Sequence, residues 1–421
     1  MNVLLINANR MKSPPVIPVG LEYLATSLQN HGHSASILDL CFSEDLEGDL
    51  QDMIEARSYD VVGFTIRNID SALFFNNEFF LPRYRSLIKI IKENHLPIVL
   101  GGAGFSAMPH EILEFLEGDF GIMGPGDRAF PQLLNSIDEG KMNPKIWNGW
   151  EAGIDPEMVP LRAQQIDYSA YTADEGIVGF TTSYGCPNRC PYCIESQTPV
   201  HFRTIPSIIR ELSALVQKGY NHFHTCDCEF NTNLQYSIEF CKALINEELD
   251  LKWALYMKPY PYNEELFEVL KASNAYLITL SVDSFKEIQS RNHYSYQDLR
   301  RIISYCHKYD LKLAIDLLTG YPYEPQESTV KVINFFKENR PSRVGISFIY
   351  RLYRHTELAE LILEDEALHE GLSKPLAEKE NFLKPIFYSQ PIRKYIEDLI
   401  EGEDIFELAG LTSGVNYQLT E

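Results

Sequence analysis

The sequence of 421 residues lacks the features of a membrane, secreted or nucleic-acid-binding protein. No apolar run approaches the ~20 residues that cross a bilayer, and the N-terminal stretch has no basic start or signal-like cleavage site. Acidic residues outnumber basic ones, since the chain has 59 Asp and Glu against 37 Lys and Arg, which gives a formal net charge of −22. That balance argues against a nucleic-acid groove or an anionic membrane surface. We therefore expect a cytoplasmic protein with no nucleic-acid or membrane partner.

Two common nucleotide-binding motifs are also missing. The Gly-Gly-Ala-Gly stretch at 101–104 follows the fourth expected strand instead of opening the first βα unit, and it lacks the dinucleotide spacing. No phosphate-cradling lysine motif is present. The eight cysteines are not arranged in pairs, as they would be in a small secreted scaffold. What remains is a chain long enough for two to three domains with buried cores.

Three cysteines, Cys186, Cys190 and Cys193, are the most informative residues that the sequence does contain. Their C-x3-C-x2-C spacing is too tight for a disulfide framework. It also leaves one ligand short of the four thiolates that normally hold an iron–sulfur cube. A cube held by three thiolates keeps one iron open for a small molecule. A glycine and two prolines in the same loop favour turns that bring the sulfur atoms to one point.

A zinc site is the alternative for these cysteines. Cys226 or Cys228 could supply the fourth thiolate of such a site. Zinc sites more often show two separated C-x2-C pairs, so the spacing favours an iron–sulfur cluster.

The cysteine segment resembles the radical S-adenosylmethionine (radical SAM) superfamily. The signature of that superfamily has the same spacing and an aromatic residue just before the third cysteine, here Tyr192. The resemblance implies a [4Fe-4S] cluster whose open iron takes the amino and carboxylate groups of SAM. It also implies that one electron cleaves SAM to a 5′-deoxyadenosyl radical. Such a cluster requires a reducing compartment.

Residues 1–140 have the pattern of an alternating α/β domain. Five short apolar runs alternate with helical patterns. This order predicts a parallel, doubly wound (Rossmann-like) sheet whose ligands bind beyond the carboxyl ends of the strands. The loops expected there are residues 7–9, 65–68, 101–104 and 124–127.

Several stretches of this domain together resemble the cobalamin-binding domain found upstream of one radical SAM subfamily. They are PPVIPVGLEYLATSL, DVVGFTI, IVLGGAGFS and GPGDRAFPQLL, the last standing where relatives usually have Gly-Glu-Gly-Glu. The resemblance implies that paired glycines let a flat corrin ring approach the backbone. The candidate cobalamin-binding residues are Asn7, Asn9, Gly20, Thr65, Arg67, Asn68, Gly101, Gly102, Gly124, Gly126 and Asp127.

The domain departs from its relatives in having no D-x-H-x-x-G motif, so no histidine is placed to ligate cobalt from below. The lower face of cobalt would meet water, a nonligating side chain or nothing. Asn9, Arg67 and Asn68 are the nearby candidates. The alternative is that the domain has lost corrin binding and serves as a scaffold, because a fold alone does not prove a ligand.

The rest of the chain divides into three parts. Residues 141–178 form a connector that prolines interrupt repeatedly. Residues 179–360 return to strand–helix units and predict a partial (β/α)6 barrel with its active face at the carboxyl ends of the strands. Residues 361–421 read as a helical C-terminal extension, which in the family covers the barrel mouth. An ordinary packing helix or an oligomer contact is the alternative for that extension.

The resemblance also implies roles for charged residues at the ends of the barrel strands. Asp227 and Glu229 follow the second strand, where relatives have an acidic stretch near the SAM amino group, a good partner for a carboxylate. Lys258, after the third strand, would neutralise the SAM carboxylate. The alternatives are a helix N-cap for the aspartate and a solvated surface position for the lysine.

The fourth and fifth strand ends are expected to contact the nucleoside part of SAM. Asp283 stands where the family often has a ribose-contacting glutamate, and Ser281 and Ser284 would share its role. Gly320 and Pro322 belong to a partial match to the family pattern Gly-x-Pro-Gly-Glu, whose backbone contacts adenine. A tyrosine replaces the second glycine of that pattern.

The resemblance implies a methyltransferase that uses both cofactors. In the reaction that the resemblance implies, SAM would first methylate cob(I)alamin. A second SAM would give the radical that abstracts hydrogen from an unactivated carbon, and the substrate radical would then take the methyl group. One alternative is a cyclisation or rearrangement without methyl transfer, and another is a noncatalytic metal-binding or corrinoid-sensing protein. The expected partners are a small-molecule or peptide substrate and an electron donor such as flavodoxin or ferredoxin.

Overall fold

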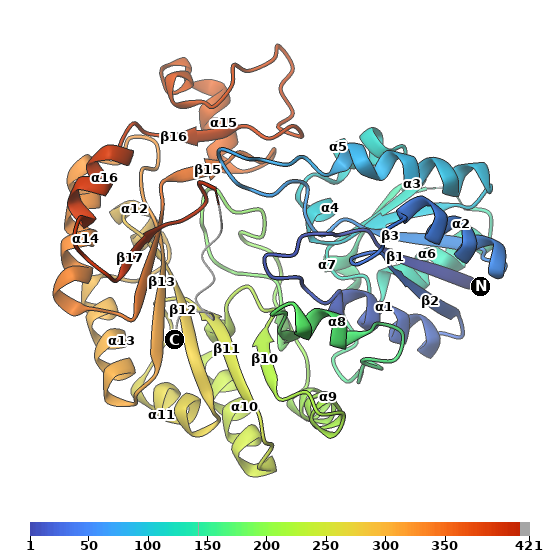
Figure 1. Cartoon of the computed structure of the whole chain (residues 1–421), viewed down its shortest axis with the longest axis horizontal. Coiled ribbons are helices and arrows are strands. Elements are labelled where there is room, and N and C mark those ends of the chain that lie inside the picture. The colour runs from blue at the N-terminus through green and yellow to red at the C-terminus, as the bar shows by residue number, and fades with distance from the viewer. Residues whose placement is uncertain (142, 413–421) are drawn as a thin grey trace. The chain divides into compact units, whose positions relative to one another are not determined.

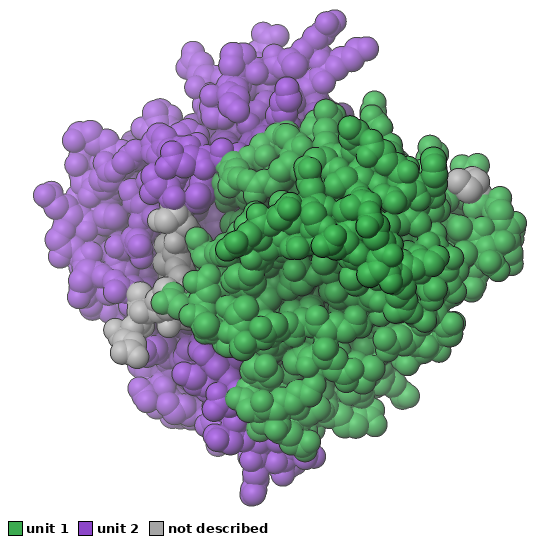
Figure 2. Space-filling model, turned by 45° about the vertical axis from the view of Figure 1, so that its right-hand side comes forward, with its two compact units in different colours: residues 1–71, 78–180, 201–220 green, residues 72–77, 181–200, 221–421 purple. Residues whose placement is uncertain are grey.

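The computed structural model describes residues 1–141 and 143–412, which form two compact units. Unit 1 comprises residues 1–71, 78–180 and 201–220, and unit 2 comprises residues 72–77, 181–200 and 221 onward. Figure 2 colours the two units separately. Within the described ranges, no helix combines the length and the apolar character needed to cross a bilayer.

Unit 1 is built on a six-stranded parallel sheet in the order β2-β1-β3-β4-β5-β6. Its central strands are apolar on both faces, as parallel strands covered by helices must be. The strands are β1 (Asn2–Asn7), β2 (Ser34–Asp39), β3 (Val61–Thr65), β4 (Ile98–Gly101), β5 (Phe120–Met123) and β6 (Ile146–Asn148).

Helices cover both faces of this sheet (Figure 1). Helix α1 packs beside α6, whereas α2, α3 and α5 pack in series. The helices are α1 (Val19–Asn30), α2 (Leu46–Ala56), α3 (Leu81–Glu93), α4 (Ala103–Ala107), α5 (Pro109–Leu116) and α6 (Ala129–Asp138). Later segments of unit 1 are α7 (Gly149–Ala152), α8 (Tyr168–Ala173), β7 (Val178–Phe180), β9 (His201–Phe202) and α9 (Ile205–Gln217).

The connector that follows residue 140 clusters with unit 1 and adds β6 to its sheet. A buried ionic network fixes it there. Arg162 of the connector donates to Glu22 of α1 over 2.7 Å and also pairs with Glu211 of α9, while Arg203 donates to Glu211 over 2.6 Å. All four charged side chains are at least 98% buried. The network carries two positive and two negative charges, so each charge has a partner.

The described strands of the main sheet in unit 2 run parallel in the order β17-β14-β13-β12-β11-β10, with helices between them in sequence (Figure 1). The strands are β10 (His222–Thr225), β11 (Lys252–Met257), β12 (Ala275–Asp283), β13 (Lys312–Leu318), β14 (Arg343–Ser347) and β17 (Phe406–Leu408). The helices are α10 (Leu234–Glu247), α11 (Glu264–Ala272), α12 (Lys286–Arg291), α13 (Tyr296–Lys308), α14 (Gln326–Asn339), α15 (Glu357–Glu364) and α16 (Arg393–Ile400).

Aromatic packing fixes the segment that follows β10. The ring of Phe230 lies edge-on to Trp253 of β11 with centroids 5.2 Å apart, and Phe240 of α10 lies 5.8 Å from the same indole. Phe230 begins the short 3-10 helix η1 (Phe230–Thr232). Asn231 within it is fully buried. These contacts hold the segment after β10 against β11 and α10.

The C-terminal extension is not simply helical, which corrects the sequence-based expectation. After α15 and the 3-10 helix η2 (Glu366–Gly371), strand β16 (Phe387–Ser389) pairs antiparallel with β15 (Ile349–Arg351). Beyond α16, β17 pairs parallel with β14. Sequence pattern could not show this because β16 and β17 are only three residues long and depend on a sheet edge. Residues 413–421 of the expected extension lie outside the described ranges.

Candidate functional site

The cysteine loop follows β7 and belongs to unit 2. Cys186 and Cys190 are 7% and 6% exposed, and Cys193 is half-buried. The backbone N–H of Cys186 donates to Thr198 Oγ1 over 2.9 Å, and that of Cys193 donates to the Cys190 carbonyl over 3.2 Å. Gly185 has a φ of +85°, and a Cβ there would overlap the carbonyl oxygen of Pro199. The loop therefore needs this glycine to fold back over its thiols.

Three side-chain N–H groups face two of the sulfur atoms. Asn188 Nδ2 lies 3.2 Å from Cys186 Sγ. Lys258 Nζ lies 3.3 Å from Cys190 Sγ, and Asn292 Nδ2 lies 3.5 Å from the same sulfur. Such donors are suited to sulfur that carries negative charge, as metal-bound thiolate does.

Burial raises the pKa of all three thiols. Burial raises the pKa of Cys186 to about 11, and burial together with the nearby Cys190 and Cys186 raises the pKa of Cys193 to about 12. Burial also raises the pKa of Cys190, against the opposing effect of Lys258. Because the thiols are neutral without metal, loading the site must release protons.

The residues considered for a zinc site do not complete one. Cys228 donates to the Glu195 carboxylate, and Cys226 is exposed. Across the described part of the chain, no group of three or more His, Cys, Asp or Glu side chains is arranged to hold a single metal ion. A zinc ion draws its thiolates to about 2.3 Å from one centre, whereas a cube distributes its thiolates over separate irons. The donor set therefore fits a cube better than a zinc ion.

Lys258 and Glu229 are both buried, and each influences the charge of the other beside the cysteine loop. Lys258 is 5% exposed, and burial alone lowers the pKa of its ammonium, but Glu229 and Cys190 raise it overall, so the side chain stays charged. Burial raises the pKa of Glu229 to about 7, against the pull of Lys258. The Oε2 atom of Glu229 is buried without a hydrogen-bond partner among the described residues. The pair thus leaves one acceptor open.

Two carboxylates expected at SAM accept hydrogen bonds from other residues of the chain. Asp227 Oδ1 accepts from the backbone N–H groups of Thr182 and Ser183 over 2.7 and 3.1 Å, and its Oδ2 accepts from the Thr182 hydroxyl over 2.6 Å. Asp283 accepts from the hydroxyl of Tyr192 over 2.5 Å. Asp227 thus fixes the start of the cysteine loop, and Asp283 fixes its aromatic residue.

The turn after β13 keeps the geometry of the family pattern despite its substitution. Tyr323, in place of the second glycine, has a φ of +63°. Glu324 Oε2 accepts from the backbone N–H groups of Gly320 and Tyr321 over 2.8 and 3.1 Å, and Ser284 donates to the same carboxylate. Sequence reasoning missed Glu324 as the residue that holds this turn, although it ends the recognised pattern. Ser281, on β12, supports Glu229 by a side-chain hydrogen bond.

The expected corrin residues of unit 1 fall into two groups. The first is polar: Asn7 Nδ2 donates to Asp39 over 2.8 Å, and Arg67 donates to Asn68 Oδ1 over 3.1 Å. Asn9 is 2% exposed, and neither of its amide atoms has a hydrogen-bond partner among the described residues. Unpaired buried amide atoms are costly, so Asn9 is the residue here best suited to receive a ligand.

The second group consists of glycines, most of which have a packing reason within the chain. At Gly102, with a φ of +99°, a Cβ would lie 2.7 Å from the Ile66 carbonyl oxygen and from Thr65 Oγ1. At Gly124 it would lie 2.7 Å from Trp150 Nε1, and at Gly126 3.3 Å from a Leu24 methyl group. Gly101 has only the Ile122 carbonyl at 3.8 Å, and Gly20 has no atom within 4 Å.

Asp127, another of the expected corrin residues, is buried, and burial raises its pKa to about 6.

Sequence reasoning missed the asparagines around the cysteine loop. Asn292 Oδ1 accepts from the Arg189 backbone over 2.9 Å, and Asn231 exchanges hydrogen bonds with the backbone of Lys258. Neither residue belongs to a motif, and no local pattern distinguishes them from exposed turn asparagines. Asn188, inside the motif, could have been noticed from its position between two of the cysteines.

Comparisons with known proteins agree with this architecture. The B12 binding domain model matches residues 13–134, and the Radical SAM superfamily model matches residues 180–336. The tryptophan 2-C-methyltransferase of Streptomyces laurentii is 24% identical over 446 residues, which cover 86% of this chain and 74% of that protein.

Solved structures share the fold over nearly the whole chain. One is the radical S-adenosylmethionine methyltransferase TsrM from Kitasatospora setae with cobalamin and a [4Fe-4S] cluster bound. It has a TM-score of 0.87 and 24% identity, covering 99% of this chain and 93% of that one. The cobalamin-dependent S-adenosylmethionine radical enzyme OxsB, with aqua-cobalamin bound, has a TM-score of 0.70 and 12% identity, covering 92% of this chain and 64% of that one.

These matches confirm the expected fold class, in which a doubly wound domain precedes a radical SAM domain with a parallel sheet. They also confirm the resemblance on which the expected cofactors rest. The chain carries a B12-binding domain ahead of a radical SAM domain.

Proposed function

We propose that this protein is a cobalamin-dependent radical SAM enzyme that transfers a methyl group to carbon. The observation that carries the proposal is the cysteine loop, where Asn188, Lys258 and Asn292 direct N–H groups at the sulfurs of Cys186 and Cys190. A loop that only closed a turn would have no need of three polar side chains, one of them a buried cation, around its thiols.

The site residues divide between holding groups and positioning groups. Cys186, Cys190 and Cys193 would hold three irons of a [4Fe-4S] cluster, leaving the fourth for SAM. When bound, the cluster supplies the electron for SAM cleavage and cobalamin carries the methyl group. Asp227 holds the first turn of the loop in place, and Glu229 offers its unpartnered oxygen to the SAM amino group.

The nucleoside part of SAM would lie along the next two strand ends. The turn that contains Gly320 and Pro322 is pinned by Glu324, so its backbone groups are rigid before adenine binds. Ser281 and Ser284 lie on the β12 side of that turn, and Asp283 orients Tyr192 in the cysteine loop. A pre-formed surface of this kind lowers the entropy lost on binding.

In unit 1, the proposed corrin contacts are Asn9, Arg67 and Asn68 on the polar side and the loops around Gly20, Gly101, Gly102, Gly124, Gly126 and Asp127. Asn7 and Thr65 are positioning residues in this proposal, because their polar atoms lie against other parts of unit 1. With no histidine in the expected motif position, cobalt would have no lower histidine ligand from this domain.

Methyl transfer is favoured over the alternatives because the similar proteins named above include a tryptophan 2-C-methyltransferase and a radical S-adenosylmethionine methyltransferase. We propose a small-molecule acceptor, an external low-potential electron donor and a reducing compartment. No observation in the described residues favours rearrangement or a noncatalytic role.

The test is anaerobic reconstitution of the full chain with iron, sulfide and hydroxocobalamin, followed by iron analysis, absorption spectra and SAM-product analysis. We expect S-adenosylhomocysteine with an acceptor and about four irons per chain. 5′-Deoxyadenosine without S-adenosylhomocysteine would indicate rearrangement, and neither product under strong reductant would indicate a noncatalytic protein.

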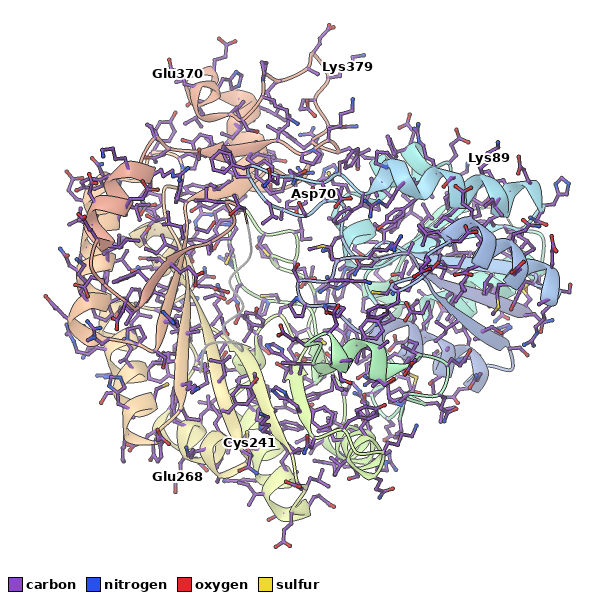
Figure 3. The ribbon with its side chains drawn as sticks, in the orientation of Figure 1. Asp70, Lys89, Cys241, Glu268, Glu370 and Lys379 are labelled. Atoms are coloured by element: carbon purple, nitrogen blue, oxygen red, sulfur yellow. The ribbon has the colours of Figure 1, made fainter. Side chains whose placement is uncertain are left out.

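The matched pair of variants is Cys186→Ala and Cys241→Ala. Both thiols are buried, but Cys241, labelled in Figure 3, lies in α10. Cys186→Ala should lose the cluster and retain corrin uptake, whereas Cys241→Ala should keep both. Loss of both cofactors in Cys186→Ala alone would contradict separate sites.

A further inference from the structure

The side chains around Cys190 suggest a role that the cysteine motif does not encode. Of the sulfur atoms in the loop, Cys190 Sγ receives two side-chain donors, Lys258 Nζ at 3.3 Å and Asn292 Nδ2 at 3.5 Å. Both donor residues are 5% exposed. A buried donor is screened little by water, so its effect on the charge of the sulfur is larger than at a surface.

Each donor is itself held in position. Asn292 Oδ1 accepts the Arg189 N–H, which fixes the amide so that its Nδ2 faces Cys190. The backbone N–H of Lys258 donates to Asn231 Oδ1 over 3.0 Å, and Asn231 Nδ2 donates to the Lys258 carbonyl over 2.9 Å. Asn231 is fully buried, and its Nδ2 also donates to the Pro261 carbonyl over 2.6 Å. These contacts keep both donors aimed at one sulfur.

We propose that Lys258 and Asn292 raise the reduction potential of the cluster through Cys190, as positioning residues that act on a ligand rather than on substrate. The inference rests on the proposed function, since it requires a cluster on the three cysteines. Reduction adds one electron from an external donor. A nearby cation and N–H donors stabilise that extra negative charge more than they stabilise the oxidised state.

The inference assigns Lys258 a different task from the one its strand position implies. At the SAM carboxylate, its removal would weaken SAM binding and leave the cluster potential without SAM unchanged. At Cys190, its removal would change the potential even when SAM is absent. The reduction potential measured without SAM therefore distinguishes the two roles of Lys258.

The experiment is a reductive titration of the reconstituted full chain without SAM, followed by electron paramagnetic resonance of the reduced cluster. Lys258→Met should lower the equilibrium constant for reduction at least tenfold, a shift of 59 mV for a one-electron couple. Lys258→Arg, which keeps charge and donors, should lower it less than threefold. Asn292→Leu, which removes a neutral donor of similar size, should lower it about threefold. Lys252→Met, at the exposed start of β11, the strand that Lys258 directly follows, should leave the equilibrium constant unchanged.

Glu229 needs its own control because it would lose its cation in Lys258→Met and take up a proton. Comparing Glu229→Gln with the double variant Glu229→Gln and Lys258→Met isolates the lysine charge. The same tenfold difference is expected between them.

Iron analysis of the wild-type chain tests the proposed function separately, since absence of a cluster there would overturn that function first. In a loaded protein, an unchanged SAM-free potential in Lys258→Met, with or without weaker SAM binding, would overturn the inference. If Lys258→Met fails to fold or load, the Asn292→Leu result decides, and an unchanged potential there overturns it as well.

Discussion

Two buried charged clusters among the described residues, one in each unit, differ in one respect, and the difference separates structure from function. In unit 1, Glu22, Glu211, Arg162 and Arg203 form a closed network with balanced charge. In unit 2, Lys258 lies beside Glu229 and Cys190, and a carboxylate oxygen has no hydrogen-bond partner among the described residues. A closed network holds segments together. A cluster with an open acceptor and a donor aimed at sulfur is prepared for a ligand.

The strongest test breaks the closed network. Arg162→Met leaves Glu22 and part of Glu211 as uncompensated buried charges, which costs about 3–5 kcal/mol of unfolding free energy. Denaturant titration followed by circular dichroism measures it. Lys242→Met, which removes an exposed pair with Glu265, should cost under about 1 kcal/mol. Equal losses of unfolding free energy in both variants would mean that this network does not hold the segments of unit 1 together.

The free energy of unfolding of the cofactor-free chain should depend on pH because of Glu229 in unit 2. Burial holds the pKa of Glu229 at about 7, above its usual value of 4.5. Its stabilising contribution is therefore complete below about pH 4.5 and is lost as pH rises through about 7, by up to roughly 3 kcal/mol. Unfolding of the cofactor-free chain between pH 5 and 8 measures this. Glu229→Gln should flatten the curve relative to wild type, and parallel curves would count against the assignment.

Asp227 of unit 2 resembles the members of the closed network, because both of its carboxylate oxygens already have hydrogen-bond partners in the chain. Because its oxygens are all used by residues 181–183, Asp227→Asn should destabilise the start of the cysteine loop by about 1–3 kcal/mol. Hydrogen exchange of that segment reports the loss. If SAM affinity falls while exchange stays slow, Asp227 serves SAM rather than the loop.

Both amide atoms of Asn9 in unit 1 are buried without a hydrogen-bond partner among the described residues. Of these substitutions, that of Asn9 should therefore change stability least. Asn9→Ala removes an amide that has no partner among the described residues, so the cofactor-free chain should lose under about 0.5 kcal/mol. Hydroxocobalamin titration followed by absorbance should show weaker uptake. Asn7→Ala breaks the 2.8 Å bond to Asp39 and the 3.2 Å bond that Asn7 Oδ1 accepts from the Asn9 N–H, so it should lower the stability of the cofactor-free chain more than Asn9→Ala does.

Much of this molecule could be predicted from its sequence. The order of strand and helix patterns specified two α/β parts, and the tight cysteine spacing specified a three-thiolate loop. The partners of those residues could not be predicted. The resemblance places Asp227 and Asp283 at SAM, but it does not reveal that they also hydrogen-bond Thr182 and Tyr192 in and before the cysteine loop. The short strand β17 depends on the edge of β14, which local pattern does not reveal.

The sequence by itself determined the chemistry that this protein can support, because cysteine spacing and the period of apolar residues are local properties of the chain. Only the tertiary structure decided that Lys258 and Asn292 meet Cys190. They lie 68 and 102 residues from it in the chain. Such contacts arise when parallel strands bring their carboxyl ends to one edge, and that register is set by packing of the whole unit.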